Sequence, residues 1–252
     1  MNKKKAFTLI ELLVVIAIIA LLMAILMPAL QRVREQAQTQ ACMSNVNSIG
    51  LGIIMYLQEN DYMMPDFFTH TGASNGHLWY PANGGGRDML KPSDHHSYWG
   101  ISFKEYVKEQ KCFGCPSFKN FYETIANDML YNEGDIHNAA FSMNGWLSKV
   151  KTSSLRRQSE VIVVHDHMEP RIENGNDMLF AESNGKNLSH YRQGGGRANW
   201  YRGIFRHGVN NGSDFETGGK LNCLWMDGHV SAIRETFGEE IPKRYYDPLG
   251  KN

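Results

Sequence analysis

The apolar residues of this chain begin with one long uncharged run near the N-terminus. Residues 12–30 contain no charged side chain and, apart from Pro28, consist of Leu, Val, Ile, Ala and Met. These 19 residues just reach the length that a helix needs to cross the hydrocarbon core of a bilayer. Lys3, Lys4 and Lys5 precede the run, and a basic flank stays on the cytoplasmic side. The pattern predicts one transmembrane helix over about residues 12–30, with the N-terminus inside.

The helical pattern continues beyond this run, but it changes from uniformly apolar to amphipathic. Residues 31–40 are polar and rich in good helix formers. An apolar stripe then recurs at spacings of four and three, formed by Cys42, Val46, Ile49, Ile53 and Tyr56. We therefore predict a helix over residues 7–59, whose second half packs this stripe against a head.

Two glycines in the same stretch weaken the predicted helix locally. Gly50 and Gly52 lack a Cβ, so they allow a strand or a loop to approach the helix closely.

The head, residues 60–252, carries strand patterns in its later part. Residues 160–165 form a β-branched run. Residues 221–226 and 229–233 flank Asp227 and Gly228, which suit a two-residue type I′ hairpin turn. The predicted fold class is α+β, a long N-terminal helix packed on an antiparallel sheet.

Composition narrows the function classes only slightly. Lys and Arg number 26 and Asp and Glu number 26, so there is no general attraction to nucleic acid or anionic lipid. The four cysteines are too few for a disulfide scaffold. Cys112 and Cys115 form a lone CxxC, which lacks the second half of a zinc ribbon. We interpret it as a small disulfide loop or as spare thiols, and leave the pairing with Cys42 and Cys223 open.

Glu11 is an unusual residue for the edge of an apolar segment. A carboxylate near the bilayer is costly and is a functional candidate, although one at the interface could simply snorkel. The segment Lys3-Lys4-Lys5-Ala6-Phe7-Thr8-Leu9-Ile10-Glu11 resembles the cleavage and methylation segment of type IV prepilins and type II secretion pseudopilins. With mature numbering from Phe7, Glu11 falls at the fifth position and Pro28 at the twenty-second, as in that family. Ala6 stands where the family usually has glycine.

This resemblance implies a mode of processing and assembly. It implies that a prepilin peptidase removes residues 1–6 as a leader, cutting between Ala6 and Phe7, and that the new amine of Phe7 is methylated. Glu11 would then pair with a neighbouring amine while Pro28 shapes the assembling helix. The expected protein is a single-pass inner-membrane pilin or pseudopilin with a periplasmic or extracellular head. Its partners would be copies of itself and the inner-membrane machinery of a type II-like secretion system.

A second resemblance involves the middle and end of the chain. Residues 45–52, residues 141–145, the triplet 206–208 and residues 227–230 are similar to a pilin-like family of Planctomycetes and Lentisphaerae-type bacteria. Its C-terminal signature places a histidine about nine residues before Asp-Gly. Here His207 lies further from Asp227, with residues 210–219 inserted between them.

Several histidines and acids are candidate metal ligands if their strands are neighbours. The candidates are His165, His167, His207, Asp227 and His229. Polar groups that cap strand ends are the simpler explanation, so we expect no cofactor.

A basic segment suggests an alternative role for the head. It interleaves cations with aromatic rings, which suits binding of DNA or of an acidic polysaccharide. Its candidate contacts are Lys186, Arg192, Arg197, Trp200, Arg202 and Arg206. A surface pilin or adhesin is therefore the alternative function, although a solvated Gly-rich loop also explains the composition.

Several catalytic signatures and a secretory cleavage site are missing from the sequence. It contains no P-loop, HExxH or dinucleotide motif, so we do not expect an enzyme, and a histidine-dependent hydrolase is a remote alternative. An ordinary secretory signal would need a small-x-small cleavage site, and residues 26–29 offer no good one.

Overall fold

The computed structural model of the chain describes residues 8–66, 79–80, 88–94, 97–120, 138–167, 172–173, 203–208, 218–236 and 241–246. Contacts divide the chain into two units, Met1–Ala37 and Gln38–Asn252.

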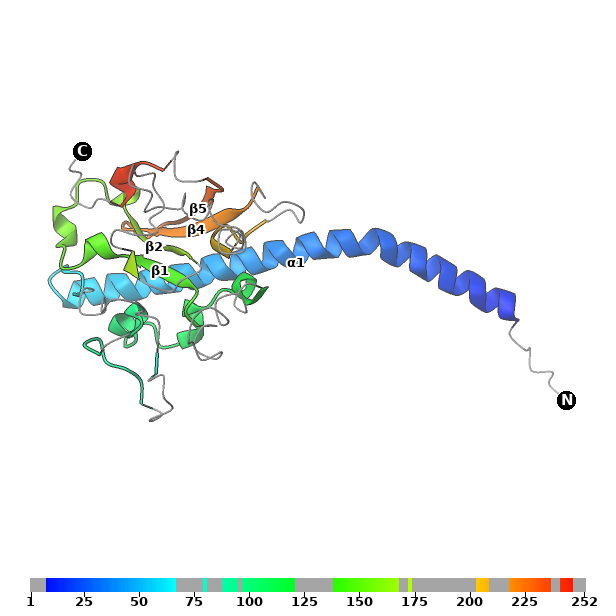
Figure 1. The fold of residues 1–252 in the computed structure, drawn as a ribbon, viewed down its shortest axis with the longest axis horizontal. Helices are drawn as coiled ribbons and strands as arrows, with labels where there is room; N and C mark the ends of the chain where they lie inside the picture. Colours follow the sequence, from blue (N-terminus) through cyan, green and yellow to red (C-terminus); the bar gives the residue numbers. More distant parts are fainter. Residues whose placement is uncertain are drawn as a thin grey trace, which may run out of the picture. The chain divides into compact units, whose positions relative to one another are not determined.

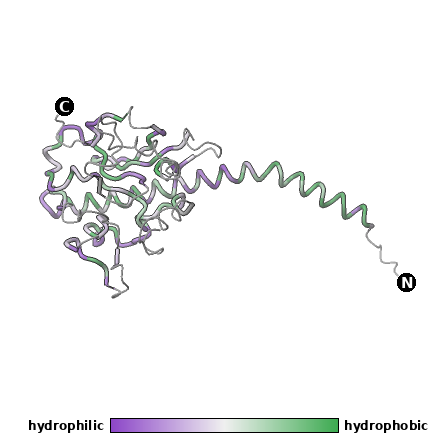
Figure 2. Tube along the Cα trace, in the orientation of Figure 1, coloured by the Kyte–Doolittle hydropathy of each residue, from purple (hydrophilic) through white to green (hydrophobic). Residues whose placement is uncertain are grey.

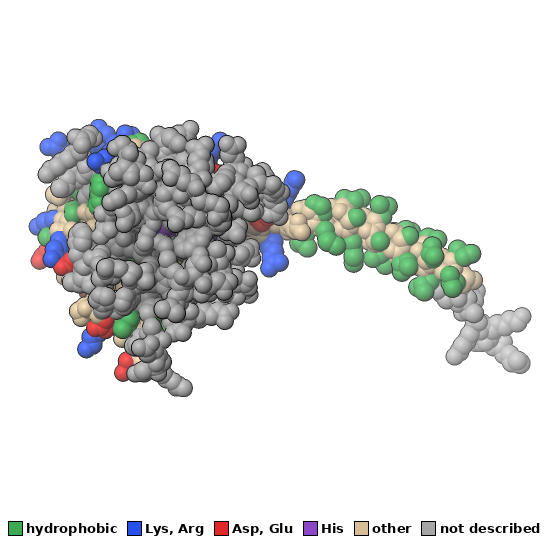
Figure 3. Space-filling view, in the orientation of Figure 1, with side chains coloured by type: hydrophobic (Ala, Val, Ile, Leu, Met, Phe, Trp, Pro, Cys, Tyr) green, Lys and Arg blue, Asp and Glu red, His purple; other side chains and the backbone are tan. Residues whose placement is uncertain are grey.

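One long helix, α1 (Leu9–Glu59), accounts for the described part of the first unit and continues into the second. In the first unit its large apolar side chains are exposed, from 45% for Val15 to 79% for Leu9. Figures 2 and 3 show this stretch as a run of hydrophobic residues. By length and composition α1 can cross a membrane, as the uncharged run predicts.

The second half of α1 belongs to the core of the second unit. Cys42, Val46, Ile49 and Ile53 are buried, as the stripe predicts, whereas Tyr56 is half-buried and Leu57 is buried beside it. A helix that buries one face in this way draws most of its stability from packing.

The head approaches α1 closely at Gly50 and Gly52, as predicted. A Cβ at Gly50 would lie 2.7 Å from Leu224 Cδ1, and one at Gly52 would lie 2.2 Å from Val107 Cγ2. The strand that carries Leu224 therefore lies against the helix (Figure 1).

The sheet has the strand order β3-β1-β2-β4-β5. Its strands are β1 (Phe141–Asn144), β2 (Ile162–Asp166), β3 (Ile172–Glu173), β4 (Lys220–Trp225) and β5 (Val230–Arg234). The pairs β1–β2, β2–β4 and β4–β5 are antiparallel, while the short β3 runs parallel to β1. A long helix with an antiparallel four-stranded sheet confirms the predicted α+β, pilin-like fold.

Short 3-10 helices lie between these elements and after the last strand. They are η2 (Trp99–Phe103), η3 (Gln110–Phe113), η4 (Pro116–Asn120), η5 (Gly145–Leu147), η6 (Thr152–Ser154), η7 (Gln158–Glu160) and η9 (Lys243–Tyr245).

The β4–β5 hairpin forms where predicted, but its turn is of another type. Trp225 N donates to His229 O over 3.0 Å, and Gly228 N donates to Trp225 O over 2.9 Å. Gly228 has a φ of 90°, whereas Asp227 does not have a positive φ. The predicted type I′ turn, which needs two positive φ values, is therefore wrong. The connection is a three-residue loop that ends on a left-handed glycine.

Aromatic side chains anchor the connections before the sheet. Tyr98 Oη and Trp99 Nε1 both donate to the carbonyl of Phe141 in β1, over 3.1 and 3.0 Å. Tyr98 and Trp99 are fully buried. Their polar tips are satisfied by one carbonyl, so the rings can fill the core without an unpaired donor.

Candidate functional site

The described chain starts with a capping box at the N-terminus of α1. Thr8 N and Thr8 Oγ1 donate to Glu11 Oε2 over 2.9 and 2.8 Å, and Glu11 N lies 3.3 Å from Thr8 Oγ1. A Thr followed three residues later by a Glu is the sequence signature of this motif. Glu11 therefore has a structural role at the helix start in addition to the assembly role that the resemblance implies.

Glu11 is also the only charged residue in a long stretch of α1. All the remaining residues from Leu9 to Gln31 are uncharged. Pro28 lies inside the helix, where it removes one backbone donor. Ala6 and Phe7, the predicted cleavage pair, lie outside the described residues.

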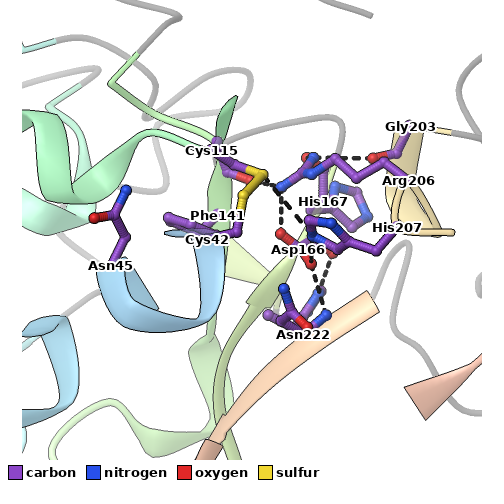
Figure 4. Close-up of polar contacts among 12 residues, drawn as sticks. Cys42, Asn45, Cys115, Phe141, Asp166, His167, Gly203, Arg206, His207 and Asn222 are labelled. Atoms are coloured by element: carbon purple, nitrogen blue, oxygen red, sulfur yellow. Dashed lines mark hydrogen bonds and ion pairs between the residues drawn. A yellow bond between two sulfur atoms is a disulfide. The ribbon is translucent and has the colours of Figure 1, made fainter. Parts of the chain in front are cut away.

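A second constellation lies in the core at the end of β2 (Figure 4). Asp166 is fully buried and accepts three hydrogen bonds from two other segments of the chain. Arg206 Nη2 lies 2.5 Å from Asp166 Oδ1, His207 Nε2 lies 3.0 Å from Asp166 Oδ2, and Asn222 N donates to Oδ2 over 2.6 Å. One carboxylate therefore joins β2, β4 and the segment that precedes β4.

Arg206 satisfies backbone carbonyls as well as this carboxylate. Its Nη1 donates to the carbonyls of His167 and Gly203 over 3.0 and 2.9 Å. Its Nη2 also donates to the carbonyl of Ala140 over 2.6 Å. A buried guanidinium with several partners is far less costly than an unpaired one.

The charge state of Asp166 follows from these partners. Burial alone would raise the pKa of Asp166, but the charge of Arg206 and the hydrogen bonds from His207 and Asn222 lower it to about 2. Asp166 is therefore ionised at neutral pH and forms a buried ion pair with Arg206.

His165 is buried next to this pair as a neutral imidazole. Its Nδ1 lies 2.9 Å from the carbonyl of Asp166, and its Nε2 contacts Tyr246 Oη. Burial lowers the pKa of His165 from 6.5 to about 4. An Nδ1–H donor and an Nε2 acceptor satisfy both ring nitrogens without a positive charge.

A disulfide between Cys42 of α1 and Cys115 lies beside the cluster. Cys115 Sγ lies 3.9 Å from His207 Nε2, and Cys112 and Cys223 are free. The interpretation of Cys112 and Cys115 as a small disulfide loop is therefore wrong. Cys115 pairs instead with a helix residue 73 positions earlier in the chain, a separation that local spacing cannot reveal.

The structure separates the five predicted metal candidates into two groups. His165, His167 and His207 are buried around Asp166 near the start of β4, where His207 pairs with Lys220. The pair Asp227 and His229 lies beyond the other end of β4 in the hairpin turn; their side chains are partly exposed and 2.6 Å apart. The five candidate side chains therefore do not converge on one point, because the two groups lie near opposite ends of β4.

The basic segment can be placed only at its last residue. Lys186, Arg192, Arg197, Trp200 and Arg202 lie outside the described residues. Arg206 is buried on Asp166, so the structure places it in the core rather than on a ligand-binding surface.

Comparison with known proteins identifies only the N-terminal region. Residues 1–27 match the prokaryotic N-terminal methylation motif. No curated protein and no solved structure matches the chain. The motif, the exposed apolar part of α1 and the α+β head together support a type IV pilin-like subunit anchored in a membrane. The motif further implies processing by a prepilin peptidase and handling by pilus assembly machinery.

Proposed function

We propose that this chain is a structural pilin or pseudopilin subunit rather than an enzyme. A prepilin peptidase would cut it between Ala6 and Phe7, and α1 would then polymerise it into a filament of a type II-like secretion system. The observation that carries the proposal is the exposed apolar stretch of α1 over residues 9–30, whose single charged side chain, Glu11, lies in the first turn of the helix and inside a methylation motif.

Membrane anchoring alone does not explain Glu11. A carboxylate is costly in the hydrocarbon core, and a simple anchor gains nothing from an acid at the edge of its apolar segment. A polar N-cap such as Thr8 supplies most of the capping stabilisation without an acid. An acid at this position is useful if a cation from another subunit meets it.

The capping geometry leaves room for such a partner. Both Thr8 donors contact Oε2 of Glu11. Within the described residues no donor contacts Oε1, and a carboxylate can accept about four hydrogen bonds. The freed amine of Phe7 in a neighbouring subunit is cationic near neutral pH, and methylation retains that charge. Pairing at Oε1 would fix the axial register of adjacent helices, because an unpaired buried charge is strongly destabilising.

Replacing Glu11 tests this proposal. We expect Glu11→Leu and Glu11→Gln subunits to insert into the membrane at parental levels but to yield few sheared filaments by electron microscopy. Glu35→Gln, which removes an acid from the same helix outside the apolar stretch, is the matched control and should assemble normally. Filaments of Glu11→Leu as abundant as those of the parent would refute the pairing.

Deletion of the gene addresses the secretion role separately. A pseudopilus subunit should be required for at least one exported protein to reach the medium, and that protein would accumulate in the periplasm of the deletion strain. Unchanged export together with loss of surface fibres would favour the adhesin alternative.

A further inference from the structure

We propose that Cys42, Cys115 and His207 form a binding site for a soft divalent cation such as Zn²⁺ when the disulfide is reduced. The two Sγ atoms and a ring nitrogen of His207 all lie within 4.8 Å of one another, and all three residues are buried. They come from α1, from the residue before η4 and from the segment before β4. Their convergence is therefore a property of the tertiary structure.

The donor set selects a particular class of metal. Two thiolates and one imidazole are ligands of zinc, and such sites are tetrahedral. Asp166 Oδ2 lies 3.0 Å from His207 Nε2, so it is placed to supply a fourth ligand.

The charges are also suitable for a buried ion. Two thiolates neutralise a divalent cation, the imidazole is neutral, and Asp166 is already balanced by Arg206. The bound form would therefore bury no net charge beyond that already present, which avoids the main cost of an ion in the core.

His207 can serve both states by moving one proton. Its Nε2 faces Asp166 Oδ2 and Cys115 Sγ, and its Nδ1 lies 3.3 Å from Thr39 Oγ1. In the disulfide form Nε2–H donates to Asp166, and Nδ1 accepts from the Thr39 hydroxyl. In the metal form Nε2 ligates the cation, and Nδ1–H donates to Thr39 Oγ1, a supporting bond typical of metal-bound histidine.

The switch between the two states is a balanced reaction. A dithiol supplies two electrons and two protons to the Cys42–Cys115 bond and becomes a cyclic disulfide. The cation then displaces the two thiol protons into solvent. Either state would tie α1 to the loop of Cys115, by a covalent bond when the sulfurs are oxidised and by the metal when they are reduced.

Cobalt absorption of the full chain in detergent micelles tests the site. The disulfide is first reduced anaerobically with a phosphine, which becomes the phosphine oxide with oxygen from water while each sulfur gains a proton. Co²⁺ is then added as the only metal. We expect the reduced chain to bind one Co²⁺ with thiolate-to-cobalt charge-transfer bands and tetrahedral visible bands, and the oxidised chain to show neither. Cys115→Ser should lose most of the charge-transfer intensity, and Thr39→Val should weaken binding roughly tenfold.

Two further measurements distinguish loss of the metal site from misfolding of a variant. The double variant Cys112→Ser, Cys223→Ala keeps both proposed sulfur ligands and should retain the full cobalt spectrum. In the reduced parent, Zn²⁺ should protect Cys42 and Cys115, but not Cys112, from alkylation mapped by mass spectrometry. Absence of cobalt binding to the reduced parent, loss of the spectrum in the double variant, or equal alkylation of Cys115 with and without Zn²⁺ would each overturn the proposal.

Discussion

Replacing Asp166 by Asn would leave Arg206 as an unpaired cation in the core. Both side chains are fully buried, with Nη2 and Oδ1 2.5 Å apart. Removing one partner of a buried ion pair typically costs about 3–5 kcal/mol, because an uncompensated charge remains. We expect Asp166→Asn to lower the free energy of unfolding by about 4 kcal/mol, and Arg206→Met to cost a similar amount.

The double variant Asp166→Asn, Arg206→Met should cost much less than the sum of the single changes. It removes both charges but deprives the carbonyls of Ala140, His167 and Gly203 of a donor. Each lost hydrogen bond is worth about 1 kcal/mol, so we expect a total loss of about 3–4 kcal/mol. The difference from the sum of the singles should be at least about 2 kcal/mol.

Urea unfolding of the full chain in a mild detergent can measure these differences, with the fluorescence of the buried Trp79 and Trp99 as the signal. Arg244→Met is the control, because it breaks a partly exposed ion pair with Glu160 and should change the free energy of unfolding little. Additive losses, within about 0.5 kcal/mol of the sum, would show that Asp166 and Arg206 do not act as a pair and would refute the reasoning.

Three other changes should have distinct effects on the same unfolding assay. Cys115→Ser opens a loop with a sequence separation of 73 and should cost about 4 kcal/mol by loop entropy, whereas Cys112→Ser, with no disulfide to lose, should change little. Gly52→Ala should destabilise by about 1–3 kcal/mol although Ala favours helices, and Gly50→Ala should cost less because only the end of a Leu side chain must move. The free energy of unfolding of the parent should fall by about 3 kcal/mol as the pH falls from 6.5 to about 4, because His165 binds a proton in the unfolded chain but stays neutral when buried. His165→Gln should remove this part of the pH dependence. A flat stability profile over this range in the parent would contradict the assignment of His165 as a buried neutral imidazole.

Local pattern predicted those parts of the fold that depend on neighbouring residues. The long helix, its buried stripe at Cys42, Val46 and Ile49, and the β4–β5 hairpin all follow from periodicity over a few residues. The turn type did not follow, because Asp-Gly fits both a type I′ turn and a three-residue loop that ends on a left-handed glycine. The capping box was not predicted, although its sequence signature is present in Thr8 and Glu11, which stand three residues apart.

The buried cluster could not be predicted, because its contacts join distant parts of the chain. Arg206 is 40 positions from Asp166, and Cys115 is 73 positions from Cys42. We predicted Arg206 as a ligand contact because it follows other basic residues in the sequence. In the structure it instead forms a buried ion pair with Asp166. No local signal distinguishes a surface arginine from a buried one when its partner lies on another strand.

Mass spectrometry of the mature N-terminus tests the central claim most directly. The protein should be purified from the membranes of cells that carry an active prepilin peptidase, and its N-terminal peptide sequenced. We predict a chain that begins at Phe7 and carries one methyl group on its amine. An intact Met1, or cleavage at any other bond, would contradict the account of this chain as a processed pilin-like subunit.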